Sequence, residues 1–164
     1  MICVVQRATG ARVIVDGQVV GQIGHGMLVL AAVHRDDTGA DIQWTAGKIA
    51  GLRIFRNAEK HFDRDVREAG GGVLLVSNFT VAGATRKGRR PSLDAAAPPD
   101  TGQRLFDELV KAVRDLGVSV QTGRFGANMQ VELVNDGPVT FIVDSREARA
   151  PGGLAIIPSP SSPS

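Results

Sequence analysis

Met27-Leu28-Val29-Leu30-Ala31-Ala32-Val33 decides the fold class, because this stretch is apolar without interruption and has the length of one strand. A strand that faces water on one side alternates polar and apolar residues, whereas a continuous apolar run indicates a strand covered on both faces. The run starts after a Gly24-His25-Gly26 break. We therefore predict that residues 27–33 form a central strand with structure packed on each side.

Further strands are predicted on the N-terminal side of this run. Residues 2–5 are apolar and β-branched, and residues 12–15 alternate before Asp16-Gly17. The Asp-Gly pair suits the left-handed backbone of a tight hairpin turn. Residues 19–23 then return as the partner strand of that hairpin.

Two helices are predicted from apolar residues that recur every three or four positions. The first spans residues 38–51, and its apolar positions are Ile42, Ala46, Ile49 and Ala50. The second follows Pro98-Pro99 and ends before Gly117, with apolar positions at Leu105, Phe106, Leu109, Val110, Val113 and Leu116.

The remaining apolar segments are short and read as strands. They are residues 52–55, 73–81, 118–121, 129–134 and 139–144. The form of the polar stretch 57–68 stays unassigned. Many strands with two helices predict a mixed α/β fold, a β-barrel-like curved sheet with the two main helices packed outside.

Length and composition point to one domain in the cytoplasm. A chain of 164 residues suits a single core, and its net charge of +2 is too small for bulk attraction to nucleic acid. The single cysteine forms no internal disulfide, no positively charged start followed by an apolar run marks a signal peptide, and no apolar run is long enough for a membrane span. We expect the domain to cover residues 1–145 and a disordered tail, rich in Pro, Ser and Ala, to cover 146–164, so that a chain ending at Asp144 folds and works normally.

The sequence shows no motif of a hydrolase that uses a side-chain nucleophile or a metal ion. The chain has no G-x-S-x-G elbow, and His25, His34 and His61 fall in or beside predicted loops, where they are expected to be solvated. One cysteine and three scattered histidines offer no metal-ligand spacing, so we expect neither a metal nor another cofactor. Cys3 lies within an apolar strand and is expected to be a small buried hydrophobe.

Three segments carry unusual chemistry, and each has an ordinary alternative. Ser77-Asn78-Phe79-Thr80 ends a predicted strand, where polar groups face a ligand or only cap the backbone. Arg86-Lys87-Gly88-Arg89-Arg90 has four cations in five residues, which either contact phosphate groups or belong to an ordinary solvated loop. Asn135-Asp136-Gly137-Pro138-Val139-Thr140 exposes main chain in a pocket or is a plain hairpin turn.

Together these segments resemble a known family. The stretch from Gly123-Arg124-Phe125-Gly126-Ala127-Asn128-Met129-Gln130-Val131 into Asn135–Thr140 resembles the C-terminal signature of the D-aminoacyl-tRNA deacylases. Thr85–Ser92, Val5-Gln6-Arg7 and Val15-Asp16-Gly17 are similar to the same family, and the likeness covers about residues 1 to 144. In one place the chain departs from the family, because Asn78 stands where the family's serine-glutamine-phenylalanine-threonine motif has glutamine.

The resemblance implies a β-barrel-like homodimer that hydrolyses the ester bond of D-aminoacyl-tRNA, a proofreading step of translation. It implies that each active site is completed by the partner's Gly137-Pro138, held in cis, whose main chain fills the space of an L side chain. Glycine has no side chain to be rejected, so glycyl-tRNA, including glycine mischarged on tRNA for alanine, is expected to be a substrate as well. Arg7 matches the position that orients this motif.

The remaining site residues also come from the resemblance. Ser77, Asn78, Phe79, Thr80 and Met129 match positions that line the pocket for the aminoacyl adenosine. Arg86, Lys87, Arg89 and Arg90 are expected to bind tRNA. The absence of a triad agrees with an ester whose ribose hydroxyl helps to activate water, with backbone N–H groups near Phe79 and Thr80 stabilising the oxyanion.

Alternatives stay open at the level of the sequence. Thr80 is a rival direct nucleophile, although no base lies near it in the chain. Asn78 leaves room for a hydrolase of the same fold that acts on another RNA-linked ester. An RNA-binding barrel that has lost turnover is the alternative outside the enzymes.

Overall fold

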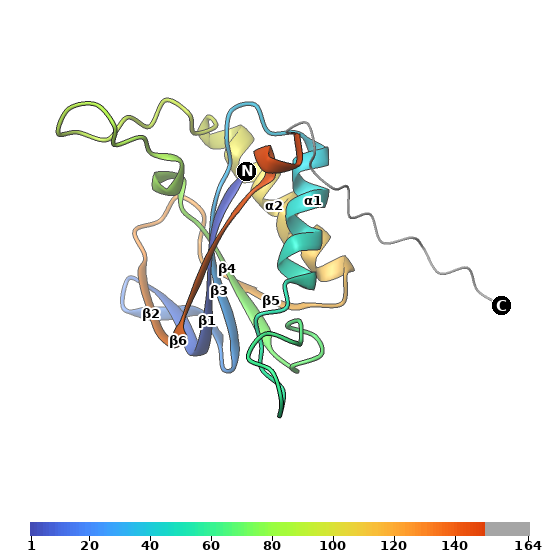
Figure 1. Ribbon diagram of the computed structural model, residues 1–164. Coiled ribbons are helices and arrows are strands. Elements are labelled where there is room, and N and C mark those ends of the chain that lie inside the picture. Colours follow the sequence, from blue (N-terminus) through green and yellow to red (C-terminus); the bar gives the residue numbers. More distant parts are fainter. Residues whose placement is uncertain (150–164) are drawn as a thin grey trace.

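A curved six-stranded sheet carries two helices on one side in the computed structural model, which describes residues 1–149 (Figure 1). The strand order is β2-β1-β3-β4-β5. β3 pairs with the first half of β1 and β2 with its last residues, whereas β6 pairs with β1 along almost its whole length. The elements are β1 (Ile2–Val15), β2 (Gln18–Ile23), β3 (Gly26–Ala32), α1 (Gly39–Gly51), β4 (Gly72–Ser77), the 3₁₀ turn η1 (Phe79–Ala82), α2 (Pro99–Asp115), β5 (Ser119–Thr122), β6 (Gln130–Asp144) and the 3₁₀ turn η2 (Ser145–Arg149). The expected mixed α/β, barrel-like fold with two outer helices is confirmed.

The central strand β3 is covered on both faces, as its composition predicts. Met27 and Val29 belong to the core between the sheet and the two helices, where Leu109 of α2 is fully buried. Leu28 belongs to a second apolar cluster, which lies inside the curve of the sheet with Val13 and other residues of β1, β2 and β4. Two separate cores on one strand explain why that strand has no polar position.

The sheet is nearly closed, because β2 lies against β5. A Cβ atom built on Gly21 of β2 would lie 2.2 Å from the carbonyl oxygen of Thr122 in β5. Only glycine permits this approach of two backbones. The Asp16-Gly17 hairpin turn that leads into β2 is confirmed, with φ of 50° and 77°.

Strands β1 and β6 are longer than predicted. Each was expected to be two short strands, but they pair antiparallel from Ile2 opposite Asp144 to Ile14 opposite Gln130. The ladder continues through bulges, which insert residues without ending the pairing and let a long strand bend. Gln6 pairs with Thr140 and Ala8 with Asn135, so Arg7 alone lies opposite the four residues 136–139.

Two predicted strand segments are wrong. Residues 52–55 form no strand and contribute only an isolated bridge between Phe55 and Arg64. β4 ends at Ser77, four residues earlier than predicted, and the chain then turns into η1. The Asn78 side chain accepts a hydrogen bond from the backbone N–H of Thr80, so a local side-chain contact replaces the next rung of the ladder.

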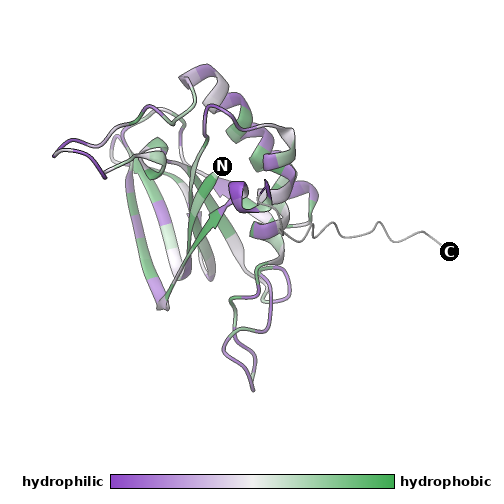
Figure 2. Cartoon of the chain, turned by 45° about the horizontal axis from the view of Figure 1, so that its top comes forward, coloured by the Kyte–Doolittle hydropathy of each residue, from purple (hydrophilic) through white to green (hydrophobic). Residues whose placement is uncertain are grey.

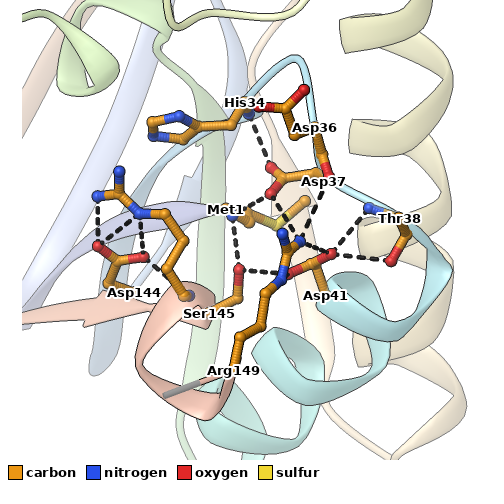
Figure 3. A network of polar contacts seen from close by, with 10 residues as sticks. Met1, His34, Asp36, Asp37, Thr38, Asp41, Asp144, Ser145 and Arg149 are labelled. Carbon is orange, nitrogen blue, oxygen red and sulfur yellow. Dashed lines mark hydrogen bonds and ion pairs between the residues drawn. The ribbon is translucent and has the colours of Figure 1, made fainter.

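The domain extends beyond residue 145. Residues 146–149, assigned to the tail from composition, belong to η2, and the rest of the expected tail lies outside the described residues. Ser145 is 1% exposed; its hydroxyl accepts a hydrogen bond from the amino group of Met1 at 2.6 Å and donates one to Asp41 Oδ1 at 2.8 Å (Figure 3). These contacts attach the end of β6 to the start of α1.

Candidate functional site

The turn after β4 presents an aromatic ring and polar groups to solvent. The N–H of Asn78 donates to the carbonyl of Ala31 at 2.8 Å, which fixes the start of the turn to β3. Asn78 Oδ1 accepts from the backbone N–H of Thr80 at 3.2 Å and from Thr80 Oγ1 at 2.5 Å. Phe79 lies between them in the chain and is 59% exposed. The shape of the turn therefore depends on Asn78, and its apolar surface is Phe79.

The hydrogen bonds of this turn decide which groups remain available for a substrate. The N–H of Thr80 is already donated to Asn78, whereas the N–H of Phe79 forms no hydrogen bond within residues 1–149. Thr80 Oγ1 also donates to the Asn78 amide oxygen, which is not a base. Of the two backbone donors expected near this point, the N–H of Phe79 is the free one.

A second exposed turn interrupts β6. The Gly137–Pro138 peptide bond is cis, and both residues are exposed. Asn135 closes the turn, since its Oδ1 accepts from Val139 N at 2.8 Å and its Nδ2 donates to Val139 O at 3.1 Å. A Cβ atom on Gly137 would lie 2.2 Å from Val139 N, so only glycine fits. The turn presents main-chain atoms with almost no side chain to cover them.

Arg7 supports this turn from beneath. Its side chain is buried, lies opposite the bulge, and donates from Nε to the carbonyl oxygen of Asp136 at 2.9 Å. Its second anchor is the carbonyl oxygen of Ile54, which accepts from an Nη atom at 2.6 Å. Nε also lies 3.1 Å from the Asp136 carboxylate. A buried guanidinium with these partners fixes the position of the Gly137–Pro138 turn relative to β1.

The two exposed turns do not meet within one chain. Ser77 pairs with Ala31, which pairs with Cys3 of β1, whereas Asn135 pairs with Ala8. Five residues of β1 separate these levels, about 16 Å at the rise of a strand. The sequence-predicted site residues therefore form two groups: the 77–80 turn, and Arg7 with Gly137 and Pro138.

Met129 lies near neither turn by sequence, just before β6 begins. It is half-buried and packs against the second apolar cluster, which also contains Val76, the residue before Ser77. A Cβ atom on Gly123 would lie 2.6 Å from the Met129 sulfur, so the thioether lies directly over that glycine. The cluster connects Met129 to the strand that ends in the 77–80 turn.

The basic loop, residues 84–92, follows η1 and projects from the body as a hydrophilic arm (Figure 2). Two backbone hydrogen bonds between Ala84 and Ser92, of 2.8 and 2.9 Å, close its base. Its four cations are exposed, and none forms an ion pair with another described residue; they are Arg86, Lys87, Arg89 and Arg90. The charge of the loop is therefore available to an external anion, at the same end of the sheet as Phe79.

The histidines and the cysteine lie outside this arrangement. His25 and His61 are exposed, as expected, but His34 is half-buried and its Nε2 has no partner among the described residues. Burial lowers the pKa of His34, and neighbouring Arg146 lowers it further. Burial raises the pKa of the Cys3 thiol to about 12, which leaves it protonated and unreactive.

Residues 1–149 contain no group of three or more His, Cys, Asp or Glu side chains arranged to hold a metal ion. In the same part of the chain no helix has both the length and the apolar character needed to cross a bilayer.

Comparison with known proteins identifies the family. The D-Tyr-tRNA(Tyr) deacylase family matches residues 4–144. D-aminoacyl-tRNA deacylases of Desulfitobacterium hafniense and Geobacter sulfurreducens are each 53% identical to the chain, over 90% and 89% of its length and 99% and 96% of theirs. A solved structure named c-Myc DNA unwinding element binding protein shares 33% identity at a TM-score of 0.83, over 88% of this chain and 98% of that one. The chain therefore belongs to the D-Tyr-tRNA(Tyr) deacylase family of hydrolases.

Proposed function

We propose that the chain hydrolyses the ester bond between a D-amino acid and the 3′ end of tRNA, releasing both. The observation that carries the proposal is the turn of residues 77–80, which offers a free backbone N–H beside an exposed ring and no side-chain base. The curated relatives are named for this activity over almost the whole chain. A protein with this substrate works in the cytoplasm, where aminoacyl-tRNA is used.

The reaction needs a nucleophile and a place for developing negative charge. Water attacks the ester carbonyl, the tetrahedral intermediate carries an oxyanion, and its collapse expels the ribose oxygen, which takes up a proton. The free N–H of Phe79 is the donor for the oxyanion, and losing such a donor typically slows a hydrolase by about 10²–10³-fold. The neighbouring ribose hydroxyl supplies the assistance that a base would give.

Thr80 is the weaker nucleophile candidate on this geometry. Its hydroxyl proton is directed at the Asn78 amide oxygen, 2.5 Å away, and an amide does not accept a proton at neutral pH. We assign Thr80 and Asn78 to shaping the turn, Ser77 to its entry, and Phe79 to contact with the terminal adenosine. Met129 lines the pocket from the second apolar cluster.

Selection for D-amino acids requires a second copy of the chain. Within one chain the Gly137–Pro138 turn lies about 16 Å along β1 from the 77–80 turn, yet both are exposed and both belong to the family pattern. β6 also exposes large apolar side chains, with Val134 63% and Ile142 60% accessible, as expected of a surface that another subunit covers. We propose a homodimer in which each Gly137–Pro138 turn enters the partner's site and excludes L side chains with its main chain; we call this turn the gate. Glycine, as in glycyl-tRNA mischarged on tRNA for alanine, has no side chain to exclude.

The basic loop is the proposed contact for the tRNA backbone. Replacing Arg86, Lys87, Arg89 and Arg90 with Ala is expected to weaken tRNA binding and to reduce the salt slope of log affinity by about 3. Binding of uncharged tRNA measured from low to moderate salt checks this. An unchanged slope would mean that the loop contacts no phosphate.

One deacylation experiment tests the main proposal. The purified protein is incubated with the same tRNA carrying a D-amino acid, its L enantiomer, or glycine, and release of the amino acid is measured. We expect turnover of the D and glycyl forms and little turnover of the L form. Turnover of the L form alone would assign the chain to a different ester.

Nucleic-acid binding without turnover is the second candidate function. Two observations favour it: the cations of the basic loop form no ion pair within residues 1–149, and a solved relative is named as a DNA unwinding element binding protein. It predicts salt-dependent RNA affinity with no release of amino acid from any of the three substrates. The same experiment therefore separates it from the proposed enzyme.

A further inference from the structure

Asp136 is held by a second arginine besides Arg7. One Nη atom of Arg56 lies 3.6 Å from Asp136 Oδ1, while Arg7 Nε contacts the other carboxylate oxygen at 3.1 Å. The Asp136 carboxylate is 29% exposed, Arg7 is buried beneath it, and Arg56 is 56% exposed above it. The residue immediately before Gly137 is therefore fixed between two cations from different segments.

The segment that carries Arg56 is itself held in place. Arg64 donates from Nε and Nη to the carbonyl oxygen of Arg56 at 3.1 and 2.7 Å. Backbone hydrogen bonds join Phe55 to Arg64 and to Asp63, and the buried ring of Phe55 anchors them to the main core. Phe62 meets Phe141 of β6 edge to face, with ring centroids 5.9 Å apart.

This segment, residues 54–64, contacts the Gly137–Pro138 turn once and residues that flank or support the turn twice. Ile54 accepts from Arg7, Arg56 pairs with Asp136, and Phe62 packs on Phe141, three residues after Pro138. Arg7 alone fixes the inner side of the turn. Arg56 limits movement of its outer side, where a turn of exposed main chain has few other contacts.

We propose that Arg56 and Asp136 are positioning residues for chiral selection: their ion pair holds the Gly137–Pro138 turn in the position in which its main chain excludes an L side chain. This inference rests on the homodimeric gate proposed above. Neither residue touches the reacting atoms in the proposal. Their loss is expected to relax discrimination and to leave the hydrolytic step in place.

Arg53, which lies just before this segment, provides a matched control. It is 54% exposed, nearly the same as Arg56, and pairs with Glu68 at 3.3 Å and with Asp63 at 4.0 Å. Arg53 makes no contact with Asp136 among the ion pairs of the described chain. Arg53→Ala and Arg56→Ala remove the same charge from neighbouring positions, and only the second releases the turn.

The test measures kcat/KM for D- and L-aminoacyl-tRNA with the full-length dimer and its variants. We expect Arg56→Ala to lower the D/L ratio about twofold to fivefold, the range that a half-exposed ion pair supports. Asp136→Asn, which also weakens the contact with buried Arg7, is expected to lower it by about tenfold. Arg56→Lys should restore most of the ratio, and Arg53→Ala should leave it at the wild-type value.

The outcomes separate this inference from the proposed function. A wild type with no preference for the D form contradicts the gate itself. A selective wild type whose ratio is the same in Arg53→Ala and Arg56→Ala overturns only the positioning role. An equal rise in KM for both substrates, in both variants, would assign the two arginines to attraction of the tRNA backbone, and also overturns it.

Discussion

The network around Asp41 and the network around Arg7 use the same chemistry, arginine against carboxylate, at two levels of the β1–β6 ladder. Asp41 is buried; it accepts from Ser145 and Thr38 and pairs with Arg149, so α1 is tied to η2 (Figure 3). The contacts of Asp41 in this network join it to other residues of the same chain. The Arg7 network ends in the Gly137–Pro138 turn, whose main chain is exposed.

This difference separates a structural network from a functional one. A network closed on itself stabilises the fold and presents nothing to a ligand. A network that ends at exposed main chain fixes the position of a surface. Disrupting the first network should therefore lower stability and spare selectivity, and disrupting the second should lower selectivity.

Gly137→Ala is expected to have the largest effect. The added Cβ would lie 2.2 Å from Val139 N, so the turn must shift. A displacement of about 1 Å at a site of this kind costs about a hundredfold in rate, and we expect a loss of D-aminoacyl-tRNA hydrolysis of that size with the dimer still folded. Deacylation rates and the solution mass check this.

Gly39→Ala is the matched control, because a Cβ at Gly39 meets nothing within 4 Å. Full D-specific activity in Gly137→Ala would show that the turn does not enter a substrate site.

Truncation tests the other network. A chain ending at Asp144 loses Ser145 and Arg149, and with them two hydrogen-bond donors to the Asp41 carboxylate. We expect its free energy of unfolding to fall by about 2–4 kcal/mol, contrary to the expectation from composition that this end is dispensable. Urea unfolding monitored by circular dichroism measures the difference.

A chain ending at Ala150 keeps η2 whole and serves as the control. Equal stability of the two truncated chains would mean that the contacts of η2 contribute nothing to the fold. The D/L ratio of the shorter chain, measured where it is still folded, should equal that of the full chain.

The stability of the protein at acid pH should depend on the same Asp41 network. Burial alone would raise the pKa of Asp41, but hydrogen bonds from Ser145, Thr38 and Arg149 outweigh it and lower the pKa below its usual range. A folded pKa below the unfolded value of about 4 means that the stabilisation is present above pH 4 and is lost as pH falls toward the folded pKa. Asp41→Asn removes this contribution.

We therefore expect the stability of the wild type to fall more steeply below pH 5 than that of Asp41→Asn, with the two curves converging in acid. Asp107→Asn, on the exposed face of α2, should keep the wild-type slope. Parallel curves for all three proteins would show that Asp41 is not a source of the acid dependence.

The smallest change is expected at the 77–80 turn. Asn78→Gln restores the residue of the family motif and adds one methylene to the side chain that accepts from Thr80. We expect activity equal to or slightly above that of the wild type, within about twofold, since volume changes at a half-exposed position are tolerated. A severe loss with intact folding would show that the turn is built around the shorter side chain.

Much of the fold was predictable because it follows from local periodicity. The apolar run of β3 and the helical spacing of α1 and α2 each report burial within one element. The Asp16-Gly17 turn reports a backbone preference of two residues. The continuity of β1 and β6 was missed, because bulges break the sequence pattern without breaking the ladder.

The candidate site divides in the same way. The cation-rich loop and the Gly137-Pro138 signature are visible in the sequence as composition and motif. The engagement of Thr80 by Asn78 and the clamp of Asp136 by Arg56 are not. Each depends on side-chain directions that a motif does not specify.

The sequence by itself determined the two helices, the central strand β3, the Asp16-Gly17 turn and the family, since these depend on residues close together in the chain. Only the tertiary structure decided that Arg7 is buried beneath Asp136, 129 residues away, and that Ser145 reaches Asp41 across 104 residues. It also set the two exposed turns about 16 Å apart along β1. The physical reason is register: one rung of the ladder fixes which distant side chains meet, and no local pattern of polarity contains that information.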